Sequence, residues 1–130
     1  MELKGRVIAR GVANGIALVS SDPISFLGGV DPLTGKIIER GHAIEGETVS
    51  GKILVFPRGK GSTVGSYVLY RMKKAGTAPA GILNSETETI VAIGAIIAAI
   101  PLVDKLNMDP ILAIKTGQHV IMQNEVILVE

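Results

Sequence analysis

Three short apolar runs separated by two helix-length segments limit the fold of this sequence more than any other feature. The runs are residues 49–56, which are most apolar at their end, 80–84 and 101–103, and the segments between them are 62–75 and 87–97. Strands that alternate with helices pair in parallel, because each helix returns the chain across the sheet in a right-handed crossover. The middle of the chain therefore predicts a βαβαβ-like unit.

The two ends of the chain predict strands that pair antiparallel. Asn14-Gly15 is a typical hairpin signal and predicts a turn over residues 12–15. Gln123-Asn124 predicts a second turn near the C-terminus. The strands expected outside the central unit are residues 2–8, 16–20, 36–39, 120–122 and 126–129. Together these elements indicate one α/β domain over residues 1–130, with a mixed sheet and strand-rich ends.

Residues 21–35 form a long segment dense in Gly, Pro, Asp and Ser. A loop of this length inside a compact domain is usually functional or disordered, and its apolar residues Phe26, Leu27 and Val30 argue against disorder. The adjacent glycines Gly28 and Gly29 allow the backbone to approach a ligand or another subunit closely. The alternative is an irregular turn capped by Asp31.

The segment from Arg58 to Ser66 follows an apolar strand and opens a helix that is expected to end at Gly76. Free backbone N–H groups and the positive end of the helix dipole converge at such a place. There they can bind an anion, or stabilise a serine oxygen as a partial or full alkoxide. The cations Arg58 and Lys60 favour this functional interpretation. The alternative is simple N-capping by Ser62 or Thr63, which is a common use of these residues.

Composition excludes several classes of function. There is no cysteine, so the chain alone forms no disulfide, thiolate nucleophile or iron–sulfur site. A net charge of +1, with two Phe, two Tyr and no Trp, gives nucleic-acid binding little support. The longest apolar run, residues 90–103, is too short to span a bilayer. The start of the chain is not a basic–apolar export signal, so we expect a cytoplasmic protein.

The two histidines, His42 and His119, have no potential metal ligands at standard spacing and are expected to be structural. The acidic pair Glu86 and Glu88 is expected to mark a solvated helix start. A hydrophobic content of 47% is more than a chain of this size easily buries, and a partner subunit is a plausible place for the excess.

Three segments together resemble the small subunit of the aconitase X family. They are Ser25-Phe26-Leu27-Gly28-Gly29-Val30-Asp31-Pro32-Leu33-Thr34-Gly35, Gly59-Lys60-Gly61-Ser62-Thr63-Val64-Gly65-Ser66 and Ala78-Pro79-Ala80. The resemblance covers nearly the whole chain. It implies the swivelling β/β/α domain with which aconitases close over their active site.

The resemblance also implies a partner and a reaction. The partner is a large catalytic subunit that forms a heterodimer with this chain and carries an iron–sulfur cluster, of the 4Fe–4S type, while this chain binds no metal. Archaeal members dehydrate (R)-5-phosphomevalonate, a small phosphorylated hydroxy acid, to trans-anhydromevalonate 5-phosphate in a modified mevalonate route to isoprenoids. Bacterial relatives dehydrate cis-3-hydroxy-L-proline. Neither nucleic acid nor membrane is an expected partner.

The catalytic serine of the family falls on Ser62, which is expected to accept the proton. Thr63 stands where relatives often carry a second serine, and it keeps the hydroxyl. Arg58 or Lys60 is expected to contact the substrate's carboxylate or phosphate, or to support the oxyanion together with the backbone at Gly61. The candidates for the subunit interface in the preceding loop are Ser25, Phe26, Gly28, Gly29 and Asp31.

Two other functions stay open on the sequence. One is a subunit of a related hydro-lyase that acts on cis-3-hydroxy-L-proline or another small hydroxy acid. The other is a non-catalytic module that binds an anionic metabolite or a protein through the same helix start.

Overall fold

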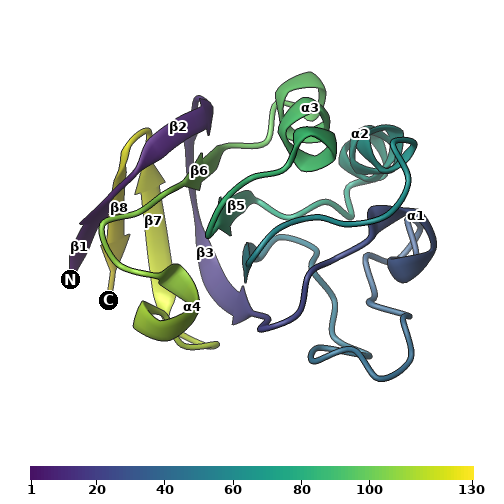
Figure 1. The fold of residues 1–130 in the computed structure, drawn as a ribbon, viewed down its shortest axis with the longest axis horizontal. Coiled ribbons are helices and arrows are strands. Elements are labelled where there is room, and N and C mark those ends of the chain that lie inside the picture. The colour runs from purple at the N-terminus through teal and green to yellow at the C-terminus, as the bar shows by residue number, and fades with distance from the viewer.

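Eight strands form a mixed sheet that curls until its two edge strands almost meet, in a computed structural model that describes residues 1–130 (Figure 1). The strands are β1 (Glu2–Lys4), β2 (Arg6–Ala9), β3 (Val12–Val19), β4 (Ile53–Phe56), β5 (Gly81–Asn84), β6 (Leu102–Asp104), β7 (His119–Gln123) and β8 (Val126–Val129). Their order across the sheet is β1-β8-β7-β3-β4-β5-β6-β2. The edge strands β1 and β2 are separated in sequence by Gly5 alone, so the first residues of the chain bring the two edges together.

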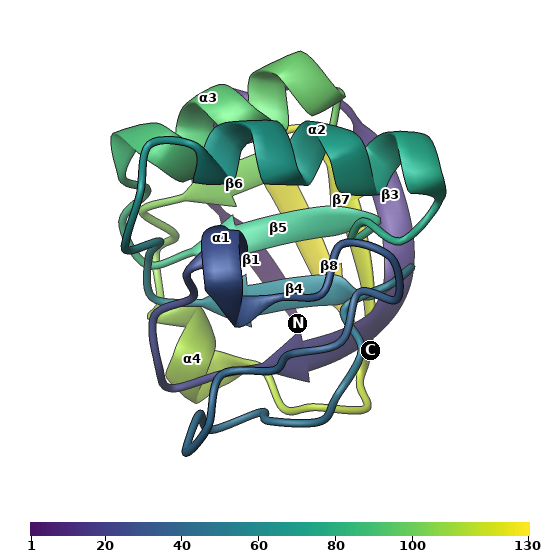
Figure 2. The ribbon, with the colours of Figure 1, turned by 90° about the vertical axis from the view of Figure 1, so that its right-hand side faces the viewer.

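Four helices complete the domain, and the two longest lie side by side on one outer face of the sheet (Figure 2). The helices are α1 (Phe26–Gly29), α2 (Gly65–Ala75), α3 (Thr89–Ala98) and α4 (Pro110–Ala113). The helix α1 is a single irregular turn, because Leu27 and Gly28 have non-helical dihedral angles.

The centre of the sheet confirms the parallel βαβαβ unit, since β3–β4, β4–β5 and β5–β6 all pair in parallel. Alternation along these strands divides the core into two clusters. Leu54, Phe56 and Ile82 pack under the helices. Ile53 and Leu83 point into the curl of the sheet. The C-terminal hairpin of β7 and β8 is also as expected.

The N-terminal hairpin prediction is wrong. Asn14 and Gly15 lie inside β3, where they pair with Ile121 and Val120 of β7. A side chain at Gly15 would meet the carbonyl oxygen of Gly51 at 2.9 Å, so glycine is required there by close approach of backbone rather than by a turn.

Residues 2–8, which were expected to form one strand, divide at Gly5 into β1 and β2 at the two edges of the sheet. Two further strand predictions are only partly right. Residues 36–39 form isolated bridges, from Lys36 to Thr48 and from Ile37 to Val30, and no continuous strand. Of residues 49–56, only Ile53–Phe56 are extended. Ile37 is nevertheless fully buried, so the expected apolar pattern reflects anchoring of a long loop to the core.

The helix expected over residues 62–75 begins later, at Gly65, and ends as expected at Gly76. Gly76 has a left-handed φ of 78°, and its N–H group bonds the carbonyl oxygens of Lys73 and Met72. Helical spacing predicts Val64 and Tyr67 on one buried face together with Val68 and Met72, but Val64 and Tyr67 are exposed. The reason is that α2 also packs against α3, which shifts its buried face toward Leu69.

A half-buried ion pair joins the paired strands β2 and β6. The carboxylate of Asp104 is fully buried and receives hydrogen bonds from Nε and Nη2 of Arg6, both at 2.9 Å, and from the N–H of Thr87 at 2.7 Å. Burial alone would raise the pKa of Asp104, but the hydrogen bonds from Arg6 and Thr87, with the charge of Arg6, outweigh it and hold the pKa below its ordinary value. The pair thereby fastens the loop before α3 to the closing strand.

Candidate active site

The loops that follow the four parallel strands gather at the carboxyl edge of the sheet. They are residues 20–25 after β3, 57–64 after β4, 85–88 after β5 and 105–109 after β6. Ligands in α/β sheets bind at this edge, where the loops surround the strand ends. The N–H groups of Ser85 and Glu86 both bond the carbonyl oxygen of Pro57, at 3.1 and 3.3 Å, and so tie two of these loops together.

The loop of residues 57–64 is held against the segment that leads into α1. The N–H of Ile24 bonds the carbonyl oxygen of Arg58 at 3.2 Å, and the N–H of Lys60 bonds the carbonyl oxygen of Ile24 at 3.0 Å. Gly61 has a positive φ of 91°, and a Cβ there would lie 2.5 Å from Oγ of Ser25. The structure thus brings Ser25 beside Gly61, although the two residues come from different predicted motifs.

Ser62 lies exposed on this loop, and a backbone donor points at its oxygen. Its Oγ accepts a hydrogen bond from the N–H of Val64 at 3.2 Å. The N–H groups of Gly61, Ser62 and Thr63 have no acceptor within the protein. Donors around a serine oxygen lower the free energy of its charged form. The start of α2 thus has one backbone donor on Oγ of Ser62 and three further N–H groups without a partner in the same loop.

The N-capping alternative holds for Ser62 as well as the functional one, because the bond from the N–H of Val64 to its Oγ is the bond that a capping serine makes in the turn before α2. The α-helix itself begins after Val64, and the hydroxyl of Thr63 makes no such bond. The first N–H groups of α2 are taken up by a tight turn, in which Gly65 bonds the carbonyl oxygen of Ser62 at 3.0 Å and Ser66 bonds that of Thr63 at 3.4 Å. The side chain of Thr63 is exposed next to Ser62.

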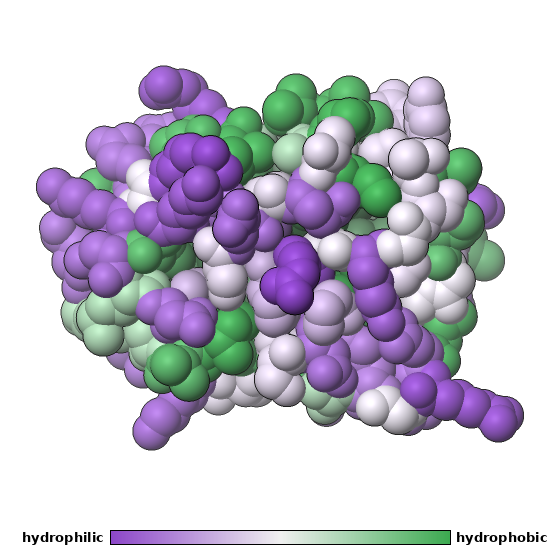
Figure 3. All heavy atoms as spheres, viewed as in Figure 1, coloured by the Kyte–Doolittle hydropathy of each residue, from purple (hydrophilic) through white to green (hydrophobic).

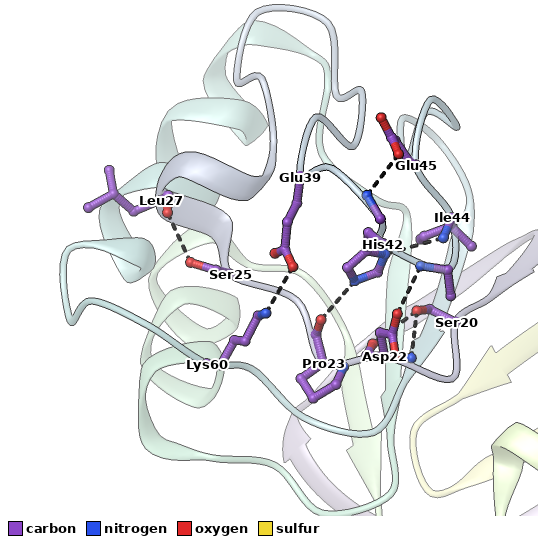
Figure 4. A network of polar contacts seen from close by, with 12 residues as sticks. Ser20, Asp22, Pro23, Ser25, Leu27, Glu39, His42, Ile44, Glu45 and Lys60 are labelled. Atoms are coloured by element: carbon purple, nitrogen blue, oxygen red, sulfur yellow. Dashed lines mark hydrogen bonds and ion pairs between the residues drawn. The ribbon is translucent and has the colours of Figure 1, made fainter.

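The two cations of the loop differ in their surroundings. Nζ of Lys60 forms an ion pair with Oε2 of Glu39 at 3.0 Å (Figure 4). Arg58 is exposed and has no side-chain hydrogen bond or ion pair. Arg58 is therefore the cation whose charge remains available to an anion.

The residues predicted in the preceding loop differ in their surroundings. Phe26 is buried edge-to-face against Phe56, with ring centroids 6.0 Å apart, and Gly29 is buried beside Ser25. Gly28 is exposed with a φ of 89°. Asp31 is apart from them: its Oδ1 accepts from the N–H of Leu33 at 3.0 Å, and its bonds stay within residues 31–36.

Sequence reasoning missed two acidic residues that support the loop. Glu39 is 21 residues away from Lys60, and nothing in the sequence pairs them. Glu88 was expected only to mark a helix start. Its carboxylate accepts from the N–H groups of Ile90 and Val91, at 2.9 and 2.6 Å, and also lies directly against Gly59. The one sequence signal for the capping role of Glu88 was its position directly before an apolar helix.

Neither histidine lies in this constellation. The ring of His42 is buried, with Nε2 2.8 Å from the carbonyl oxygen of Pro23 and Nδ1 accepting from the N–H of Ile44 at 3.2 Å (Figure 4). His119 lies near Glu130 at the end of the chain, with 3.4 Å between Nδ1 and Oε1. His42 fixes the loop that leads into Ile24 and Ser25, which is a structural role.

The chain has no cluster of potential metal ligands, and it has no enclosed pocket at Ser62. It has no cysteine, and no three His, Asp or Glu side chains are grouped to hold a metal ion, so its residues do not fit an iron–sulfur cluster. The one pocket, of about 280 Å³, lies near the other end of α2 and is lined by Ser50, Gly51, Lys73, Gly76 and residues 78–80. No helix has the length and apolar character needed to cross a bilayer.

Comparison with known proteins identifies the family. The family model of the aconitase X swivel domain matches residues 2–129. A protein of Methanocella arvoryzae named phosphomevalonate dehydratase small subunit is 54% identical over 130 residues, which are 100% of this chain and 98% of that protein. A protein of the same name from Thermococcus sibiricus is 62% identical over 118 residues, covering 91% of this chain and 88% of its own.

Solved structures agree with the fold. The crystal structure of Thermococcus kodakaraensis aconitase X in its holo-form superposes with a TM-score of 0.94 at 49% identity, covering 100% of this chain and 98% of that one. A solution NMR structure of a UPF0107 protein superposes with a TM-score of 0.90 at 47% identity, covering 100% and 99%. The α/β fold with its nearly closed mixed sheet is therefore that of the aconitase X swivel domain.

Proposed function

The chain belongs to the aconitase X swivel-domain family, and on that premise we propose that it is the small subunit of a phosphomevalonate dehydratase in which Ser62 removes the proton. The observation that carries the proposal is the placement of Ser62. In a chain that matches relatives of this name along its whole length, an exposed serine oxygen faces a backbone donor at the carboxyl edge of the parallel strands.

The chemistry explains why a serine would serve. The hydrogen to be removed is on the carbon next to a carboxylate, which is a weak carbon acid, so the base must be strong. A serine alkoxide is strong enough where hydrogen-bond donors stabilise it. The C–H bond breaks, the proton passes to Oγ of Ser62, and the electron pair forms the carbon–carbon double bond as the hydroxyl leaves the adjacent carbon.

The other groups of this chain bind the substrate or hold the loop of Ser62 in position. Arg58, the unpaired cation, contacts the carboxylate or phosphate of the substrate. Lys60, held by Glu39, fixes the course of the loop. The backbone at Gly61 and Thr63 adds free N–H groups near the charged oxygens.

The rest of the site is assigned to a larger partner subunit, which the name of the relatives implies. An iron–sulfur cluster, which the aconitase family implies, would be held there, since the residues of this chain do not fit one. Departure of the hydroxyl is assigned to that subunit as well. Ser62 is exposed on the surface of this chain, and the active site is assigned to the place where the two chains meet.

Reconstitution tests the proposed function. We expect the isolated chain to have no dehydratase activity, and its mixture with the purified large subunit to convert (R)-5-phosphomevalonate to trans-anhydromevalonate 5-phosphate. The measurement is product formation followed by mass spectrometry, with cis-3-hydroxy-L-proline as the comparison substrate. Conversion of hydroxyproline alone would assign the chain to the related hydro-lyases, and absence of any complex would refute the subunit assignment.

Substitution of Arg58 distinguishes a catalytic subunit from a binding module. We expect Arg58→Ala to raise KM about 10- to 100-fold through loss of a charge-assisted contact, with a smaller effect on kcat. Lys36→Ala, at an exposed lysine outside the site, is the matched control. A module that only binds an anion would lose ligand affinity in Arg58→Ala and tolerate Ser62→Ala. An unchanged KM in Arg58→Ala would contradict its contact with substrate.

A further inference from the structure

The outer side of α3 is apolar and exposed. Ile93, Ile96 and Ile97 keep 47%, 58% and 44% of their surface accessible. The sequence has no charged residue between Thr89 and Ile100, so α3 itself contributes no charged side chain to this surface. Apolar atoms gather at the top of the molecule in Figure 3, where Figure 1 places α3. A helix that is apolar on all sides is normally buried, and this one is covered only by the sheet and by α2.

The exposed surface continues onto α2. Gly94 lies so close to α2 that a Cβ there would be 3.1 Å from Cα of Ser66. Tyr70, which is 41% exposed, follows Ser66 by one turn and therefore lies on the same side of α2. We name Tyr70, Ile93, Ile96 and Ile97 the α2–α3 patch.

A basic rim borders this patch at the C-terminal end of α2. Arg71, Lys73 and Lys74 are all exposed. Nζ of Lys74 lies 5.5 Å from the ring centroid of Tyr70, over its face. An apolar centre with a charged rim is the usual anatomy of a protein–protein interface.

The patch leads to the loop that carries Ser62. The two helices begin at the same end, where a Cβ at Gly65 would be 3.3 Å from Cγ2 of Ile90 and 3.8 Å from the backbone nitrogen of Leu27. Leu27 and Val64 are 46% and 48% exposed at this junction. A partner that covers the patch and continues past the helix starts therefore also covers Ser62.

We infer that the α2–α3 patch is the docking surface for the large subunit, an inference that rests on the proposed function. The partner surface is apolar at its centre and acidic where it meets Arg71, Lys73 and Lys74. A second copy of this chain fits less well, because a twofold contact uses the same surface on both sides, and this surface has no acidic residue to pair with Arg71, Lys73 and Lys74. A large subunit bound at the α2–α3 patch would also cover the exposed Ser62 and exclude water from its oxygen.

The test measures the affinity of the small subunit for the purified large subunit by titration calorimetry. We expect Ile93→Glu and Ile97→Glu each to raise Kd about thirtyfold or more, since a charge would be buried at the apolar centre of the interface. Val12→Glu is the matched control, because Val12 is 71% exposed at the start of β3, at the opposite edge of the sheet from Ser62. Its Kd is expected to stay within about threefold. Circular dichroism verifies that each variant is folded.

The outcomes separate the inference from the proposed function. If the unchanged chain does not bind the large subunit, the proposed function fails and the inference fails with it. If the unchanged chain binds and both isoleucine variants bind within about threefold of it, only the docking surface is refuted. A dimer of the isolated chain that Ile93→Glu dissociates would assign the patch to a second copy and would also overturn the inference.

Discussion

Replacement of Ser62 by alanine is expected to lower kcat of the assembled dehydratase by about 10³- to 10⁴-fold. The variant removes the only hydroxyl that receives the N–H of Val64, and no other strong base of this chain lies on the loop. KM should change little, because substrate contacts are assigned to Arg58. Steady-state kinetics on the complex of the two subunits measures both constants.

The matched control for this variant is Ser21→Ala, which removes an exposed hydroxyl outside the 57–64 loop. It should keep kcat within about twofold, as surface substitutions usually do. Both variants should assemble with the large subunit, because neither changes the α2–α3 patch. Ordinary turnover in Ser62→Ala would exclude Ser62 as the base.

The substitution Gly59→Ala, which adds one methyl group, is expected to lower kcat of the assembled dehydratase by about 100-fold. A Cβ at this position would overlap Oε1 of Glu88 and Cγ2 of Val91. The loop then moves away from α3, or Glu88 gives up its cap bonds to the first turn of α3. Either movement displaces Ser62, three residues further on, from its working position. Kinetics of Gly59→Ala in the complex measures the loss.

Gly46→Ala is the comparison for this second variant. Gly46 has a positive φ of 86° in an exposed turn with open space around it, so alanine there costs backbone strain of about 1 kcal/mol without moving the site. We expect Gly46→Ala to lower the melting temperature slightly and to leave kcat unchanged. Equal losses of activity in both variants would indicate general destabilisation and contradict a positioning role for Gly59.

Local chemistry explains which parts of the fold were predictable. The βαβαβ order follows from apolar runs separated by helix-length segments, and the end of α2 follows from Gly76. The hairpin predicted from Asn14-Gly15 was wrong, because the same dipeptide is compatible with a turn and also with a close backbone approach inside a strand. Only the neighbouring chain, here Gly51, distinguishes the two uses.

In the candidate site, too, local features could be predicted from the sequence and contacts between distant segments could not. The position of Ser62 before a helix could be predicted from glycines, hydroxyls and cations in one short segment. The ion pair from Lys60 to Glu39 and the contact of Gly59 with Glu88 could not, because they join segments that only the folded sheet brings together. The exposure of Tyr67 likewise depends on how α2 meets α3, which periodicity within one helix does not reveal.

Hydrogen exchange at the reacting carbon tests the central role of Ser62 most directly. The complex is incubated in D2O with phosphomevalonate, and deuterium on the carbon beside the carboxylate is followed by mass spectrometry as the reaction approaches equilibrium. The complexes with the unchanged chain and with Ser21→Ala are predicted to incorporate deuterium, and that with Ser62→Ala to stay at the level of the solvent control. Incorporation by Ser62→Ala at the rate of the unchanged complex would show that another group moves this proton.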